Sequence, residues 1–167
     1  MMTDNLLSIQ RCAVAAFCAL LVIAPLQVAA VGGDSSGGSA GASVDFNTEL
    51  RKARQHITAE RYSRAIQLLR DVVSQDRRNA EAFNLLGFAS RKLEKYRDAE
   101  RYYVSALKID PEHRGALEYQ GELFLAIGQP ENAHANLARL LELCGINCTE
   151  YRELKRAIAV HLSLIHI

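Results

Sequence analysis

The sequence contains no tryptophan, few other aromatic residues and almost no net charge. Its 20 lysines and arginines nearly balance 19 aspartates and glutamates, so there is no strong positive field to attract nucleic acid. The G-x-S-x-G, H-E-x-x-H, Walker and G-x-G-x-x-G patterns are all missing, and the five histidines are scattered. These absences predict a protein that is not an enzyme, does not bind nucleic acid and needs no cofactor or metal.

Long hydrophobic runs are also scarce. The longest covers only thirteen apolar or small residues, Cys12 to Ala24, preceded by Arg11 and ended by Pro25. That is short of the ~20 residues needed to span a bilayer. The pattern predicts a secretory signal peptide over residues 1–30, cleaved after Ala30; an uncleaved anchor is the alternative. We therefore expect a periplasmic or secreted protein with no stable membrane insertion after cleavage.

Two further segments do not fit a folded domain. Residues 31–43 hold five glycines and four serines, a composition that buries little apolar surface and predicts a disordered linker. Residues 162–167 are suddenly apolar, with no polar face, and resemble translated adapter sequence at the end of an assembled gene. They are interpreted as a non-native tail, the alternative being a true apolar terminus that packs somewhere. The folded domain is then expected over residues 44–161.

Within this domain alanine recurs every 34 residues, at Ala65, Ala99 and Ala133. A fixed period of this length indicates stacked helical units. Small residues let the two helices of a unit cross closely, and neither helix pair can bury its apolar face alone, so the units stack. An ordinary helical bundle with coincidental alanines is the alternative.

Residues 80–113, the middle copy, resemble the tetratricopeptide repeat family. They share its large aromatic, leucine–glycine, small and closing proline positions: Phe83, Leu86, Gly87, Ala99, Tyr103, Ala106 and Pro111. The first copy is weaker, with Glu49 and Lys52 where large apolar residues are usual, as suits an outer helix without a neighbour on its far side.

The resemblance implies an all-α fold, an α-solenoid of three helix-turn-helix units and a C-terminal capping helix. The units are expected at about 46–79, 80–113 and 114–147, and the capping helix at about 149–161. The individual helices are expected at about 45–59, 62–76, 79–93, 96–109, 112–127 and 130–143. Asn79 and Asp110 are predicted N-caps, while Gly128 closes one helix and Pro130 opens the next.

Two cysteines, Cys144 and Cys148, remain after signal cleavage. In an oxidising compartment they predict a structural disulfide, provided that the helix is broken at Gly145 or Asn147. A thiol- or metal-linked accessory protein is the alternative function, with copper(I) as the candidate metal because it favours thiolate ligands. A redox dithiol is disfavoured because the spacing is C-x3-C. The surrounding residues 143–155 resemble a terminal block of small exported tetratricopeptide proteins from Gram-negative bacteria, chiefly alphaproteobacteria.

In the tetratricopeptide family the first helix of each unit lines a concave groove that binds peptides. The resemblance implies that an unidentified protein or peptide binds here, with self-association through the weak first unit as a further expectation. The implied groove residues are Asn47, Leu50, Arg54, Ile57, Asn84, Phe88, Arg91, Lys92, Glu118, Glu122 and Leu125.

We expect Arg54 and Arg91 to be able to hold a carboxylate together. The alternative is a solvated face with no partner. The carboxylate clamp by which the family binds chaperone tails is not found, since Leu50 and Arg54 stand in its first-unit positions. The protein is therefore expected to be a non-catalytic interaction scaffold that does not bind a cytosolic chaperone tail.

Overall fold

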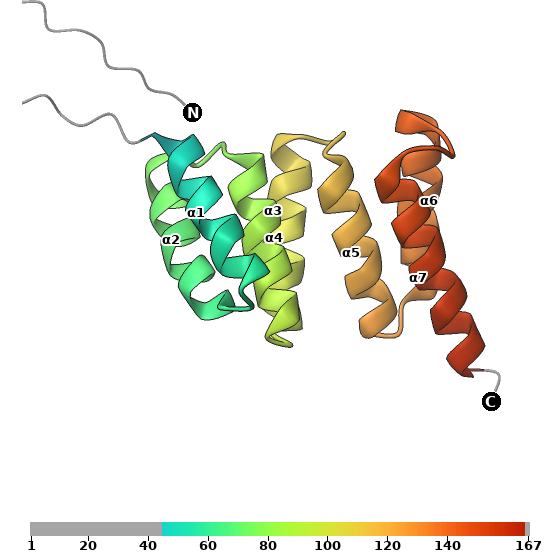
Figure 1. Ribbon diagram of the computed structural model, residues 1–167. Helices are drawn as coiled ribbons and strands as arrows, with labels where there is room; N and C mark the ends of the chain where they lie inside the picture. Colours follow the sequence, from blue (N-terminus) through green and yellow to red (C-terminus); the bar gives the residue numbers. More distant parts are fainter. Residues whose placement is uncertain (1–44, 166–167) are drawn as a thin grey trace, which may run out of the picture. The chain divides into compact units, whose positions relative to one another are not determined.

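The computed structural model describes residues 45–165, and within this range the chain forms seven α-helices and no strand (Figure 1). The helices are α1 (Phe46–Thr58), α2 (Tyr62–Gln75), α3 (Ala80–Lys92), α4 (Tyr96–Ile109), α5 (Arg114–Ala126), α6 (Pro130–Cys144) and α7 (Thr149–Ile165). The first six agree with the expected helices to within two residues at either end. The proposed signal peptide and linker lie outside the described residues. None of the described helices has the length and apolar character to cross a membrane.

The helices pack as three successive pairs, α1 with α2, α3 with α4 and α5 with α6, closed by α7. The first helices of the pairs also contact one another in order: α1 contacts α3, α3 contacts α5, and α5 contacts α7. These four helices therefore form one continuous layer, which Figure 1 shows side by side, and α2, α4 and α6 pack behind it.

Small residues at the helix crossings explain the 34-residue period. Ala65, Ala99 and Ala133 are all completely buried. Gly87 lies directly against the Tyr103 ring, where an added Cβ would come within 2.5 Å of a ring carbon. Gly121 lies equally close to Leu154 of α7. Larger side chains at these positions would push the helices apart, so the small residues fix how closely the pairs pack.

Most of the expected helix ends are confirmed. The Asn79 side chain accepts a hydrogen bond from the backbone N–H of Ala82 at 2.9 Å and so caps α3. Gly128 has a φ of 73°, a left-handed conformation that suits glycine, and Pro130 is the first residue of α6.

The expected cap at Asp110 is wrong. Helix α5 begins at Arg114 and is capped by His113, whose Nδ1 accepts from the N–H of Ala116 at 3.2 Å. The Asp110 carboxylate instead accepts from the N–H of Glu112, within the turn that follows α4. The Asp110 carboxylate thus stabilises the turn. The first N–H groups of α5 need a different acceptor, which His113 provides.

The last helix covers the end of the third pair. It packs on α5 and α6, with Leu154 fully buried and Ile158 nearly so. It continues to Ile165, beyond the expected end near residue 161, so part of the segment interpreted as a tail prolongs the helix. Helix α6 ends at Cys144, followed by Gly145 at a φ of 72°. The chain is thus broken between the two cysteines, as a bond between them requires.

Candidate functional site

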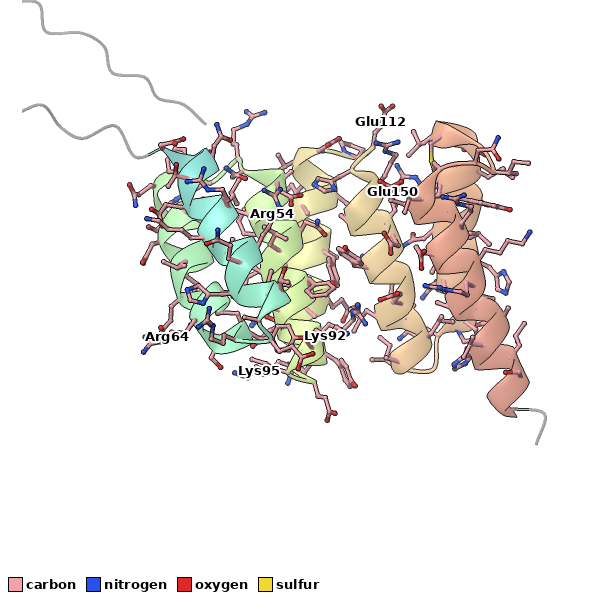
Figure 2. All side chains as sticks on the ribbon, viewed as in Figure 1. Arg54, Arg64, Lys92, Lys95, Glu112 and Glu150 are labelled. Carbon is pink, nitrogen blue, oxygen red and sulfur yellow. A yellow bond between two sulfur atoms is a disulfide. The ribbon has the colours of Figure 1, made fainter. Side chains whose placement is uncertain are left out.

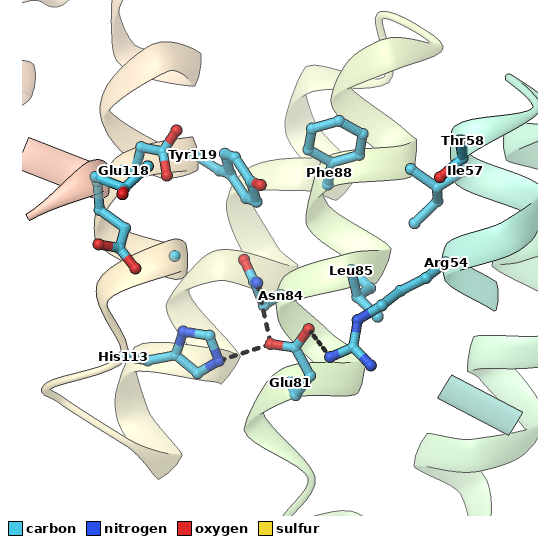
Figure 3. A pocket seen from close by; sticks show the side chains of 13 residues that line it. Arg54, Ile57, Thr58, Glu81, Asn84, Leu85, Phe88, His113, Glu118 and Tyr119 are labelled. Atoms are coloured by element: carbon cyan, nitrogen blue, oxygen red, sulfur yellow. Dashed lines mark hydrogen bonds and ion pairs between the residues drawn. The ribbon is translucent and has the colours of Figure 1, made fainter. Parts of the chain in front are cut away.

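The layer of first helices carries a pocket of about 500 Å³ (Figure 3). It is lined by side chains or backbone of Arg54, Ile57, Thr58, Glu81, Asn84, Leu85, Phe88, His113, Gly115, Glu118, Tyr119, Thr149 and Glu150. These residues come from α1, α3, α5 and the first turn of α7, with His113 at the start of α5. The pocket therefore spans all three helix pairs and the capping helix.

A second hollow, of about 400 Å³, lies beside the first between α5 and α7. Glu122, Leu125 and Val160 are among the residues that line it. Glu118, Glu122 and Leu125 succeed one another along one face of α5, because residues three and four apart on a helix are neighbours. The two hollows consequently follow the same helix face.

Seven of the eleven groove residues expected from the sequence line these hollows. Five line the first hollow and two line the second: Arg54, Ile57, Asn84, Phe88, Glu118, Glu122 and Leu125. The other four do not. Leu50 is in the apolar core, Asn47 is exposed outside both hollows, and Arg91 and Lys92 pack near the Phe88 ring.

Arg54 and Arg91 are not available as a joint carboxylate site, because each already has its own carboxylate. Arg54 pairs with Glu81 at 2.7 Å. Arg91 pairs with Glu122, and its guanidinium lies 5.5 Å from the centre of the Phe88 ring. The sequence could not show these partners, since both ion pairs join residues of neighbouring units.

Glu81 is the centre of a polar network that the sequence did not reveal. It accepts hydrogen bonds from Arg54, from Asn84 Nδ2 at 3.3 Å and from His113 Nε2 at 3.0 Å, all drawn in Figure 3. Burial alone would raise the pKa of Glu81, but these hydrogen bonds outweigh it and hold the pKa below its usual value. The hydrogen bond between Glu81 and His113 also raises the pKa of His113. The network links α1 to α3 and to the start of α5.

The repeat period contains a signal that could have found two of the missed residues. Asn47, Glu81 and Gly115 lie 34 residues apart and occupy the same position in the three units. Only Asn47 was expected in the groove, whereas Glu81 and Gly115 line the pocket. If every expected groove position is repeated at intervals of 34 residues, Asn47 leads to Glu81 and Gly115.

Glu118 differs from the other charged residues of the pocket. The residue is only 8% exposed, and it has no hydrogen bond or ion pair to any described residue. Burial, followed by the neighbouring carboxylates of Glu122, Glu150 and Glu153, raises the pKa of Glu118 to about 8. Asn84 Oδ1 is likewise buried without a partner, on a side chain 3% exposed.

Aromatic rings form one wall of the pocket. The centres of the Phe88 and Tyr119 rings lie 4.8 Å apart, and Tyr62 packs on Phe88 from α2 at 6.5 Å. Phe88 was expected in the groove, whereas Tyr119 was missed. Together they offer an apolar surface beside the unpartnered polar groups.

The two cysteines lie next to the pocket, just before α7. Their sulfur atoms are 2.06 Å apart and their Cα atoms 5.7 Å apart; Figure 2 draws the bond in yellow. Among the described residues, one group of potential metal ligands gathers closely: Cys144, Cys148 and Glu150, with ligand atoms within 4.8 Å of one another. The predicted bridge and a metal site would use the same two sulfur atoms, so each excludes the other.

Residues 80–113 match the family model of the tetratricopeptide repeat. No curated protein sequence matches the chain. Among solved structures, the Yersinia enterocolitica type III secretion translocator chaperone SycD is similar, with a TM-score of 0.63 and 20% identity over 76% of this chain and 96% of that one. The first TPR of Spaghetti (RPAP3), bound to the HSP90 peptide SRMEEVD, has a TM-score of 0.62 and 22% identity over 70% and 92%.

A third similar structure is PcrH in complex with the chaperone binding region of PopD, with a TM-score of 0.62 and 19% identity over 75% and 96% of the two chains. At this level of identity the likeness establishes the fold. The expected all-α solenoid of helical repeats is thereby confirmed, and so is the resemblance of the middle unit to the tetratricopeptide repeat.

Proposed function

We propose that this helical-repeat domain is a non-catalytic scaffold that holds a peptide, or an extended segment of another protein, against α1, α3, α5 and α7. The observation that carries the proposal is the pocket itself, to which all three helix pairs and the capping helix contribute. Similar solved structures support it, because SycD is also known in complex with a peptide of the translocator YopD, PcrH with a region of PopD and the Spaghetti repeat with an HSP90 peptide.

The arrangement of the hollows suits an extended segment better than a compact ligand. Gly115 lines the first hollow and Leu125 the second, ten residues apart on α5. At 1.5 Å per residue this is a path of about 15 Å. An extended peptide advances about 3.3 Å per residue, so four or five of its residues would cover both hollows.

The proposed location is the periplasm, or outside the cell, after cleavage of residues 1–30. This rests on the sequence pattern alone. Fusion of residues 1–43 to alkaline phosphatase without its own signal tests it in a Gram-negative host. Activity in the periplasm is expected, and it should disappear when Leu20 and Leu21 are both changed to arginine. Equal activity of the two fusions would remove the proposed export.

Photo-crosslinking tests the groove. The crosslinker p-benzoylphenylalanine replaces Thr58, an exposed residue that lines the pocket, or in the control Val104, which is 53% exposed on α4 outside it. Each full chain is irradiated with a pool of random synthetic peptides, and the products are read by mass spectrometry. We expect peptide adducts chiefly from position 58. Equal yields from the two positions would contradict the proposal.

A thiol- or metal-linked accessory function remains the second candidate, favoured only by the cluster of Cys144, Cys148 and Glu150. Intact mass measurement of the exported protein separates the two candidates. A loss of two hydrogens with no bound metal supports a structural bridge, whereas stoichiometric copper would favour the accessory function.

A further inference from the structure

We propose that the pocket selects a cationic side chain of the bound peptide, the ammonium group of lysine or the guanidinium group of arginine. This inference rests on the proposed function, because it names the chemistry of what the groove holds. It stands on two unpartnered acceptors, Glu118 and Asn84 Oδ1, and on the charges around them.

The first acceptor is the Glu118 carboxyl group. Three arginines of this layer lie beside other acids: Arg54 pairs with Glu81, Arg91 with Glu122, and Arg114 approaches Glu150 at 3.8 Å. Glu118 is left with no ion pair and no hydrogen-bond donor among the described residues, although the residue is only 8% exposed. The carboxyl group belongs to the lining of the pocket, from which a donor of a bound ligand can reach it.

The second acceptor is Asn84 Oδ1, on a different helix. The orientation of the Asn84 amide is fixed, because its Nδ2 donates to Glu81, and exchanging the amide atoms would place oxygen against a carboxylate. The oxygen therefore points away from Glu81, toward the side of the pocket where Tyr119 lies (Figure 3). It is buried and has no partner. Two acceptors, one on α3 and one on α5, thus receive no hydrogen bond from any described residue, although both belong to residues that line the pocket.

The charge of the pocket favours a cation over an anion. Arg54 pairs with Glu81 and Arg114 lies 3.8 Å from Glu150, so the acidic group of the pocket that has no cation within ion-pair distance is Glu118. A peptide carboxylate there would meet like charge, while a lysine or arginine would supply both positive charge and several donors. The Phe88 and Tyr119 rings can cover the aliphatic stem of either side chain.

The ionisation of Glu118 is consistent with this role. Burial and the carboxylates of Glu122, Glu150 and Glu153, opposed by Arg91, keep Glu118 largely protonated at neutral pH in the free pocket. A bound cation favours the ionised form, so binding displaces that proton into solvent. Among the described residues only Arg91, which pairs with Glu122, partly favours the ionised form of Glu118.

Peptide selection tests the inference. A phage-displayed library of random short peptides is selected against the full chain, as wild type and as the variants Glu118→Gln and Glu142→Gln. Glu142→Gln is the matched control, because Glu142 is exposed on α6 and lines neither hollow. Wild type and the control should both enrich peptides with lysine or arginine at one fixed position.

The selected peptides are then resynthesised with norleucine in place of lysine or citrulline in place of arginine. Wild type should lose affinity by about tenfold or more, and Glu118→Gln by less than about twofold, with the two replacements separating an ammonium from a guanidinium preference. Thermal melting verifies that each variant is folded.

The outcomes separate the inference from the proposed function. Peptides that crosslink to position 58 but show no cationic position, or that lose equal affinity on wild type and Glu118→Gln, would overturn the inference and leave the scaffold function standing. Failure of any peptide to bind the groove would overturn both.

Discussion

The two sides of the pocket differ in whether their glutamate has hydrogen-bond partners. On the α1–α3 side the Glu81 carboxylate has three donors, and its pKa is held below the usual value. On the α5–α7 side the Glu118 carboxyl has none, and its pKa is raised to about 8. Both are glutamates on the first helix of a unit, so their surroundings cause the difference.

The contrast separates two roles for charge in a repeat protein. The Glu81 network joins α1 to α3 and to the start of α5, so it helps to hold successive units in register. Glu118 holds nothing together and opposes folding when ionised. Residues that lower stability without structural compensation are expected where a protein meets a partner.

Removing the centre of the paired side should have the largest effect. Glu81→Ala leaves the Asn84 amide and the His113 ring without their acceptor and removes the partner of Arg54. We expect the free energy of unfolding to fall by about 3 kcal/mol at pH 7, measured by urea denaturation. Glu100→Ala, at an exposed position on α4, should change it by less than about 0.5 kcal/mol. Equal losses would show that the network does not stabilise the stack.

Removing the charge of Glu118, on the unpaired side, should raise the free energy of unfolding instead of lowering it. The pKa of Glu118 in the folded protein, about 8, is above its ordinary value of 4.5. The folded state therefore binds more protons between these two values, and wild-type stability falls as pH rises through this range. Glu118→Gln should therefore be more stable than wild type by about 2 kcal/mol at pH 9. At pH 4 the two should unfold at nearly the same urea concentration. A difference that does not depend on pH would contradict the raised pKa.

Arg54, the most exposed residue of the Glu81 network, should contribute least to stability. The Arg54 side chain is 53% exposed, and ion pairs of this kind contribute little. We expect Arg54→Ala to lower the free energy of unfolding by about 0.5 kcal/mol, and 1 M salt to remove most of that difference. If Arg54→Ala lowered the free energy of unfolding as much as Glu81→Ala does, the arginine and not the glutamate would be the main stabilising member of the network.

Local sequence signals were enough to predict the stack. The 34-residue period, the small residues at Ala99 and Gly87, and the Asn79 cap each act within one unit, so they can be read along the chain. The break between Cys144 and Cys148 follows from the same local logic, since Gly145 allows it.

The pocket was only partly predictable, because its polar contacts join different units. Glu81 and His113 are 32 residues apart in the sequence, too far to be neighbours on a single helix. Their contact depends on how α3 and α5 pack. The same holds for Arg91 with Glu122. Leu50 was misplaced because α1 turns this position into the core, where it is only 7% exposed. The repeat register identifies candidate positions but not their partners.

Titration of the side-chain carboxyl groups by carbon-13 NMR tests the contrast most directly, because both glutamates report in one experiment on the free protein. The account predicts that Glu81 titrates below the usual glutamate range and that Glu118 titrates near pH 8. Titration of both groups near pH 4.5 would contradict it, since the two sides of the pocket would then be electrostatically alike.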